Sequence, residues 1–170
     1  MNQSMKSMAE GLKTAVQMEA DGYSFYNMVA DTTKDSRGRQ VFRTLANEEL
    51  GHLNFLKLQY KSVVETGRVD SAASLGLRQD LAGSSPIFTD EVMKRIGSAH
   101  IEMSALSIGI QLELGSIKFY EDQARRAPDA DVRKFYDELV KWESGHYHAL
   151  LRQQELLKED YWSASQFAPF

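Results

Sequence analysis

Four segments of the chain carry apolar or small residues at the spacing i, i+3, i+4 and i+7, which marks one face of an α-helix. Each face also holds a glutamate near its middle, where an unpaired charge would be costly and a bound cation would compensate it. The positions are Leu12, Val16, Glu19, Tyr23, Tyr26 and Ala30; Phe42, Leu45, Glu49, His52, Leu53 and Leu56; Leu106, Ile110, Glu113, Ile117 and Tyr120; and Val132, Leu139, Glu143, His146, Leu150 and Leu157. The pattern predicts an all-α protein built from four long amphipathic helices.

Two polar breaks divide these helices into two hairpins. Residues 34–36, a Lys-Asp-Ser stretch, lie halfway between Glu19 and Glu49. Residues 128–129, a Pro-Asp pair that stops a helix, lie halfway between Glu113 and Glu143. Residues equidistant from the turn of an antiparallel hairpin sit at the same height, so each pair of glutamates is predicted to meet near mid-bundle, about 20 Å from its turn.

A glycine- and serine-rich stretch joins the two hairpins. It is roughly 20 residues long and could span about 65 Å when extended, enough to travel the length of the bundle, and Thr89 or Asp90 is expected to cap the next helix. We predict one domain over residues 1–170, with hairpin one at about 4–66, the crossover at about 67–88, hairpin two at about 89–158 and an aromatic tail at 159–170. The tail is too apolar for a solvated segment and is expected to pack on the bundle or on a second subunit.

Composition narrows the range of functions. Apolar residues make up 42% and charged residues 26% of the chain, and the net charge is −4 with both signs interspersed, so no nucleic-acid-binding face is predicted. There is no cysteine, which excludes disulfides, iron–sulfur clusters, thiolate zinc sites and thiol nucleophiles within these residues. The longest uncharged run, Met103 to Leu112, is too short to cross a bilayer, and we expect a cytoplasmic protein without membrane contact.

A three-part pattern occurs twice: a lone glutamate and, 30 residues later, a Glu-x-x-His unit. The copies, Glu19 with Glu49 and His52, and Glu113 with Glu143 and His146, are offset by 94 residues. Flanking residues repeat at the same offset, since Phe25-Tyr26 matches Phe119-Tyr120. Self-similarity at a fixed offset indicates a duplicated structural unit, so the two hairpins are predicted to be pseudo-symmetric.

These six side chains form the ligand set with which a four-helix bundle holds two metal ions, one element from each helix. Glu and His three residues apart point inward together, so one helical turn delivers two ligands. Carboxylate oxygens with one imidazole per metal suit iron or manganese, and zinc could also bind. The alternative is that the buried Glu and His residues are structural hydrogen-bonding partners.

Other polar residues near the pattern have weaker claims to a role. Tyr26 and Tyr120 lie two turns beyond the lone glutamates on the same face, where their hydroxyls could hydrogen-bond to ligand carboxylates, and otherwise they are core aromatics. Glu48 is expected to face solvent. His148 has the wrong spacing to share the face of His146, and His100 and Glu102 are interpreted as structural.

The six candidate ligands resemble the rubrerythrin branch of the ferritin-like di-iron superfamily, as a stand-alone erythrin domain without a rubredoxin domain. The resemblance covers nearly the whole chain except the crossover and the tail. It implies a ferritin-like four-helix bundle, made of two helical hairpins joined by a long crossover, that binds two iron ions. By this resemblance the bridging ligands are Glu49 and Glu143, the terminal ligands are Glu19 and Glu113, and His52 and His146 complete one metal each.

Two features depart from that family's pattern. Full-length rubrerythrins carry a rubredoxin-type domain with four cysteines, and this chain has none, so an external donor such as a rubredoxin or a reductase is expected to supply electrons. Many rubrerythrins also place an extra glutamate one turn from the third-helix ligand, linked to movement of an iron. Ile110 and Ser116 stand at the candidate positions, so that movement is not predicted here.

The resemblance implies an oxidoreductase that forms a homodimer. It also implies that the six ligands are the catalytic residues. It would reduce hydrogen peroxide in oxidative-stress defence, or activate dioxygen. A ferroxidase that feeds an iron store or buffer and a manganese catalase-like enzyme use similar ligands, and hydroxylation of an organic substrate is a further option. A non-catalytic helical module, with its buried Glu and His residues paired by hydrogen bonds, is the alternative from a different class.

Overall fold

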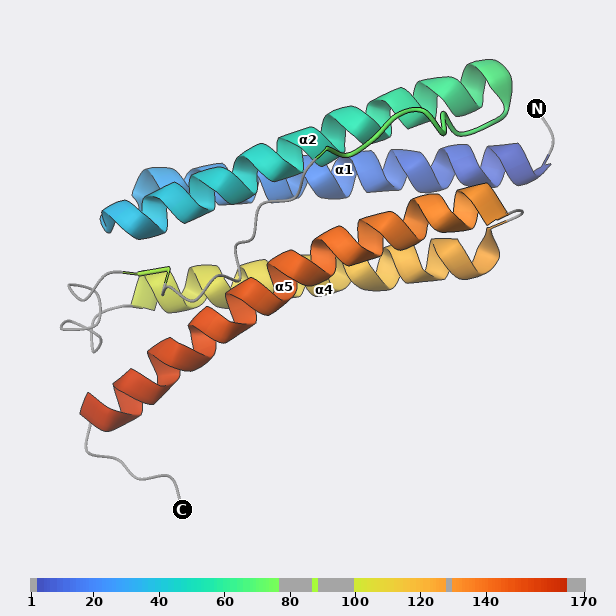
Figure 1. Ribbon diagram of the computed structural model, residues 1–170. Helices are drawn as coiled ribbons and strands as arrows, with labels where there is room; N and C mark the ends of the chain where they lie inside the picture. Colours follow the sequence, from blue (N-terminus) through green and yellow to red (C-terminus); the bar gives the residue numbers. More distant parts are fainter. Residues whose placement is uncertain (1–2, 77–86, 89–99, 128–129, 165–170) are drawn as a thin grey trace.

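The computed structural model describes residues 3–76, 87–88, 100–127 and 130–164 (Figure 1). Within these ranges the chain forms four α-helices and no strand: α1 (Gln3–Thr32), α2 (Ser36–Thr66), α4 (His100–Arg126) and α5 (Ala130–Ala164). The all-α class and the four-helix bundle are therefore confirmed. Helix α5 includes Tyr161 and Trp162, which the sequence analysis had placed in the tail. The predicted helix start at Thr89 or Asp90 lies outside the described residues.

The ends of α2 follow from local chemistry. Asp35 has an extended backbone, and its side chain accepts a hydrogen bond of 2.7 Å from the Gly38 N–H, which caps the start of the helix. At the other end Gly67 adopts φ 77°, a left-handed conformation that costs glycine little, and its N–H donates to the Val63 carbonyl oxygen. The first hairpin therefore turns at the polar stretch that the sequence predicted.

The two hairpins lie side by side with their turns at opposite ends of the bundle (Figure 1). Helices α1 and α2 pack together as one antiparallel pair, and α4 and α5 form the other. Because α2 ends at one end of the bundle and α4 begins at the other, the chain between them has to return along its length (Figure 1). This arrangement confirms the predicted long crossover between two hairpins.

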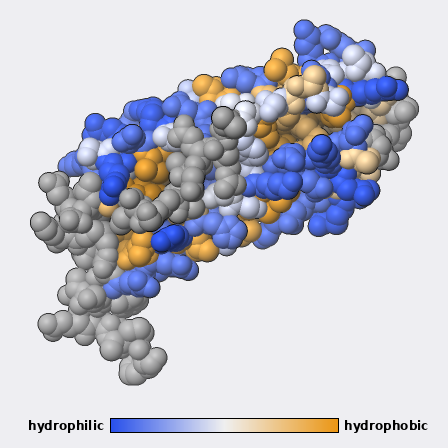
Figure 2. Space-filling view, in the orientation of Figure 1, coloured by the Kyte–Doolittle hydropathy of each residue, from blue (hydrophilic) through white to orange (hydrophobic). Residues whose placement is uncertain are grey.

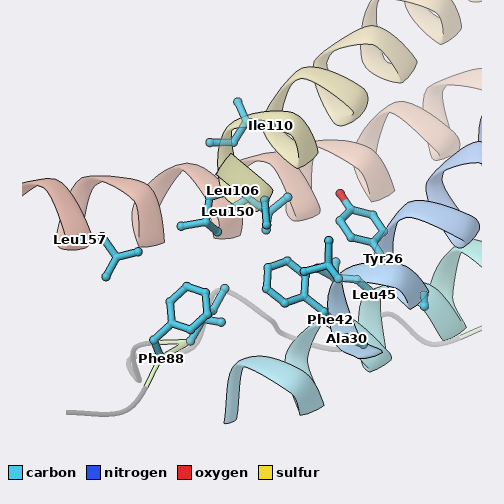
Figure 3. Close-up of a cluster of buried hydrophobic side chains, with 13 residues drawn as sticks. Tyr26, Ala30, Phe42, Leu45, Phe88, Leu106, Ile110, Leu150 and Leu157 are labelled. Atoms are coloured by element: carbon cyan, nitrogen blue, oxygen red, sulfur yellow. The ribbon is translucent and has the colours of Figure 1, made fainter. Parts of the chain in front are cut away.

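The core consists of two apolar clusters along the bundle. One gathers the buried side chains shown in Figure 3, among them Phe42, Leu106 and Leu150. The other contains Leu56 and Leu139 among its members. The clusters are related by the internal repeat, because the rings of Tyr26 and Phe42 stack in one at 6.3 Å, and the rings at the matching positions, Tyr120 and Tyr136, stack in the other at 6.2 Å.

The face in Figure 2 is largely hydrophilic and is interrupted by apolar patches. Exposed large apolar side chains on the described surface are Met28, Leu58, Tyr60, Val64, Ile101 and Ile108. Within the described residues no helix contains a stretch long and apolar enough to cross a membrane.

Candidate metal centre

The six predicted ligands lie inside the bundle, and none is more than 3% exposed. Their positions follow from helix periodicity, since each glutamate occupies the middle of the apolar face that its helix turns inward. Burying four carboxylates and two imidazoles at one depth would be very costly without compensating charge. The structure therefore brings together all six side chains that the sequence singled out.

The six residues form two overlapping groups. One group is Glu19, Glu49, His52 and Glu143, and the other is Glu49, Glu113, Glu143 and His146; within each, one ligand atom per residue lies within 4.8 Å of the others. Glu49 and Glu143 belong to both groups, which is the position expected of carboxylates that bridge two ions. Each remaining glutamate and histidine belongs to one group only.

Several of the ligand atoms face one another without a hydrogen bond, although His52 Nδ1 and Glu19 Oε2 form one at 3.2 Å. His146 Nδ1 lies 3.2 Å from Glu49 Oε1, yet neither atom has a hydrogen-bond partner among the described residues. His52 Nδ1 lies 3.0 Å from Glu143 Oε1, which also lacks one. Atoms that bind one cation at about 2.1 Å lie about 3 to 3.5 Å apart and aim at a common point. The orphaned buried atoms and their spacing therefore fit a metal site.

Electrostatics divide the four carboxyl groups into two kinds. Burial raises the pKa of Glu19 and of Glu113 well above the ordinary value, and neighbouring carboxylates raise both further. Burial also acts to raise the pKa of Glu49 and of Glu143. For these two, close polar contacts with neighbouring side chains and the positive charge of the imidazoles outweigh burial, so the pKa of Glu143 falls to about 2 and that of Glu49 falls well below its ordinary value.

For the two histidines, burial and the neighbouring charges act on the pKa in the opposite directions. Burial acts to lower the pKa of His52 and of His146, but the surrounding carboxylates outweigh it and raise both well above the ordinary value. These directions favour protonated imidazoles beside ionised Glu49 and Glu143, so protons can offset part of the charge of the cluster. Metal ions would replace these protons, because they bind ionised carboxylates and neutral imidazoles.

The two buried tyrosines cross between the hairpins. Tyr26 on α1 donates its hydroxyl hydrogen bond to Glu113 Oε1 on α4, and Tyr120 on α4 donates to Glu19 Oε1 on α1. Burial raises the pKa of both hydroxyls well above the ordinary value, and the nearby carboxylates raise it further, so both remain donors. The predicted hydrogen bonds to ligand carboxylates are present, and each tyrosine serves the opposite hairpin's glutamate.

The expectation that Glu48 faces solvent was wrong. Its side chain is 9% exposed, and its Oε2 lies 2.7 Å from His146 Nε2. The other ring nitrogen, Nδ1, is the one that faces the carboxylates of the cluster. A signal was available in the sequence, because Glu48 follows Leu45 by three residues and precedes His52 by four. That spacing places it at the edge of the buried face.

Trp142 is a second residue that the sequence analysis missed. It is 9% exposed, and its ring meets the ring of His52 edge to face, with centroids 5.1 Å apart and planes at 89°. His52 Nε2 is buried and has no hydrogen-bond partner among the described residues. Trp142 stands 94 residues after Glu48, so the two are repeat-related positions with different chemistry.

A cavity of about 170 Å³ reaches the cluster between α1 and α4. Its lining residues are Met18, Asp21, Gly22, Tyr26, Glu49, Gln111, Leu112, Glu113, Gly115 and Ser116. A Cβ at Gly22 would lie 3.5 Å from the Glu49 carboxyl carbon, and a Cβ at Gly115 would meet nothing within 4 Å. A cavity of about 150 Å³ can hold benzene, so the space admits several water molecules or a small ligand.

The remaining candidates lie outside the two ligand groups. His148 and His100 are exposed and Glu102 is buried at the start of α4, and none of them joins either group. At the positions of the extra rubrerythrin glutamate, Ile110 is buried in the apolar core and Ser116 lines the cavity. Neither side chain provides a carboxylate for a moving metal.

The Rubrerythrin family model matches residues 10–154 of the 170-residue chain. The chain belongs to the Rubrerythrin family. It is therefore a ferritin-like protein of the di-iron oxidoreductase type, and its buried Glu and His cluster fits metal binding. Neither the curated proteins nor the solved structures gave a significant match.

Proposed function

We propose that this rubrerythrin-family protein is a di-iron peroxidase, which reduces hydrogen peroxide to water with electrons from an external donor. The observation that carries the proposal is the pair of overlapping Glu and His groups at the floor of a small cavity. Two iron ions held there would supply the two electrons that convert H₂O₂ and two protons into two water molecules. Manganese or zinc would fit the same donor atoms.

Two residues of the cluster would contact both metals, and the other four would contact one metal each. Glu49 and Glu143 would contact both ions, Glu19 and His52 would complete one site, and Glu113 and His146 the other. Tyr26 and Tyr120 fix the orientation of the two terminal glutamates through their hydroxyl hydrogen bonds. Ligands held in this way keep their geometry when charge is gained or lost at the centre.

The cavity admits a small oxidant. Its 170 Å³ are ample for hydrogen peroxide or dioxygen, since a cavity of about 150 Å³ can already hold benzene. The described apolar clusters close the bundle on both sides of the centre along its axis, which limits the approach of water from the two ends of the bundle. We favour peroxide reduction over hydroxylation of an organic molecule because the chain belongs to the Rubrerythrin family.

Electrons would enter from outside these residues. The chain contains no cysteine, so none of its side chains can hold the cysteine-bound iron of a rubredoxin-type domain. We propose a rubredoxin or a reductase as the donor, and a homodimer as the assembly. Sedimentation equilibrium of the iron-loaded protein tests the assembly, because a ferritin-like cage of many subunits would contradict it.

Stopped-flow oxidation tests the reaction. Iron-loaded, reduced protein is mixed anaerobically with hydrogen peroxide or aerobically with dioxygen at matched concentrations, and the absorbance of oxidised iron is followed. Peroxide is expected to react at least about tenfold faster, a difference of about 1.4 kcal/mol in activation free energy. Faster reaction with dioxygen would favour a ferroxidase instead, and slow reaction with both would contradict the peroxidase assignment.

A further inference from the structure

The two halves of the metal centre share their ligands but differ in what stands behind the two histidines. Behind His146 is Glu48, whose Oε2 lies 2.7 Å from His146 Nε2. Behind His52 is Trp142, whose ring meets the imidazole at 5.1 Å, and His52 Nε2 has no hydrogen-bond partner among the described residues. The internal repeat relates these two positions, so a symmetric ligand set has an asymmetric surrounding.

A carboxylate behind a ligating histidine acts on the metal through the ring. It accepts the Nε2–H hydrogen bond, which fixes the tautomer with Nδ1 available to the metal, holds the ring plane, and makes Nδ1 a stronger donor. Loss of such a partner typically weakens metal binding by about 10- to 100-fold. Among the described residues nothing comparable fixes His52, because an edge-to-face aromatic contact restrains a ring without accepting its N–H.

We propose that the two metal positions are inequivalent, and that Glu48 makes the Glu113–His146 position the tighter one, filled before the Glu19–His52 position. The inference rests on the proposed metal centre. In this scheme Glu48 is a positioning residue that does not ligate the metal. Trp142 leaves the second position weaker, which makes that metal the more readily exchanged of the two.

The shared bridging ligands do not remove this difference. Glu49 and Glu143 contribute to both groups, so each position receives the same two bridging carboxylates and one terminal glutamate. The terminal glutamates are also matched, since each accepts a hydroxyl hydrogen bond from a buried tyrosine. Among these contacts of the described residues, the partner of the histidine is therefore the one that differs between the two positions.

The test is an anaerobic titration of the metal-free protein with Co²⁺, followed by visible absorption and by calorimetry. Wild type is expected to bind two Co²⁺ per chain in two resolved steps that differ at least about tenfold in affinity. Glu48→Leu should weaken the first step by about 10- to 100-fold and leave the second nearly unchanged, so that the steps merge. The first-step affinity of Glu48→Gln should lie between those of wild type and Glu48→Leu, because the amide oxygen still accepts the hydrogen bond but carries no charge.

Glu65→Gln is the matched control. Glu65 is an exposed glutamate on the same helix, 3.9 Å from Lys61, and its substitution should leave both steps unchanged. Circular dichroism of each metal-free variant reports on folding. If Glu48→Leu does not fold, the comparison of Glu48→Gln with wild type still decides the case.

A complementary variant tests the weaker position. Trp142→Glu places a carboxylate where the repeat puts Glu48, and it should strengthen the second step toward the affinity of the first.

The outcomes separate two kinds of failure. No Co²⁺ binding in wild type would contradict the metal centre itself. Two bound ions of equal affinity, or equal weakening of both steps in Glu48→Leu, would overturn the inequivalence and leave the metal centre standing.

Discussion

The α1–α4 face and the α2–α5 face of the cluster differ in what lies outside the ligands. On the α1–α4 face, Gly22 and Gly115 leave a cavity that reaches Glu49 and Glu113. On the α2–α5 face, a cavity of about 360 Å³ lined by part of the 69–76 segment reaches Trp142, whose ring meets one imidazole, but none of the six Glu and His residues lines it.

That second face is held by specific contacts. Gln59 donates to the Asp70 carbonyl oxygen at 2.9 Å and accepts from the Asp70 N–H at 2.8 Å, which fixes the start of the crossover against α2. The comparison teaches that the cavity on one face reaches the ligand carboxylates directly, and that Trp142 separates the cavity on the other face from His52. Substitutions on the two faces should therefore fail in different ways.

Removing one of the two carboxylates that both groups share should prevent metal binding, on which the roles of both faces depend. Glu143→Ala takes one carboxylate from both metal groups, so iron content should fall from two per chain to well below one, as measured by elemental analysis after loading. Glu138→Ala is the control, because Glu138 is half-exposed on the same helix and pairs with Lys141. Retention of two irons in Glu143→Ala would contradict the bridging role.

Closing the cavity should affect reaction and spare metal binding. Gly115→Leu is expected to slow oxidation of the reduced centre by peroxide about tenfold or more, equivalent to about 1.4 kcal/mol, because the new side chain stands at the cavity wall. Iron content should remain that of wild type. The measurement is the second-order rate constant by stopped flow.

Gly51→Leu is the matched control for that experiment. Gly51 is exposed on α2, and a Cβ there also meets nothing within 4 Å, but Gly51 does not line the cavity. Both substitutions should raise helix stability by about 0.5–1 kcal/mol, since glycine is a poor helix former. Equal rates in the two variants would rule out the α1–α4 opening as the route.

Substitution of the two buried tyrosines tests whether their hydrogen bonds contribute equally to stability in the two halves of the repeat. Tyr26→Phe and Tyr120→Phe each leave a buried carboxyl oxygen without its donor. Each should lower the free energy of unfolding of the metal-free protein by about 1–3 kcal/mol, measured by denaturant unfolding. Tyr60→Phe, at a partly exposed position on α2, should change little. A loss confined to one of the two buried tyrosines would break the symmetry.

The smallest effect is expected where the crossover meets α2. Gln59→Leu removes both hydrogen bonds to Asp70 and should lower the free energy of unfolding by about 1 kcal/mol. Its iron content and its rate with peroxide should match those of wild type. Asn54→Leu, at an exposed position on the same helix, is the control. A slowed peroxide reaction in Gln59→Leu would show that the α2–α5 face also takes part in access.

Much of the site could be read from single helices. Periodicity places Glu49 and His52 on one inward face because residues three apart are neighbours on a helix. The midpoint of each hairpin turn then sets the height at which paired glutamates meet, and the 3.2 Å between His52 Nδ1 and Glu19 Oε2 agrees with that height. These inferences depend on spacing within one hairpin, which the amino-acid order fixes.

Contacts between the two hairpins were harder to predict from the sequence. Tyr26 was expected near a ligand carboxylate, but its partner, Glu113, belongs to the other hairpin, 87 residues away. Glu48 lies at the edge of its helix face, where a small rotation of α2 decides between solvent and His146. The spacing along one helix cannot fix its rotation relative to a neighbour.

The order of residues alone determined the helices, the first turn and the six inward-facing Glu and His side chains, because periodicity and charge burial act on each helix separately. The tertiary structure decided which hairpin each tyrosine serves, which imidazole receives a carboxylate, and where the bundle opens. Those features depend on the tilt, rotation and close approach of helices from different hairpins, and pairwise packing sets these only once the whole bundle has assembled.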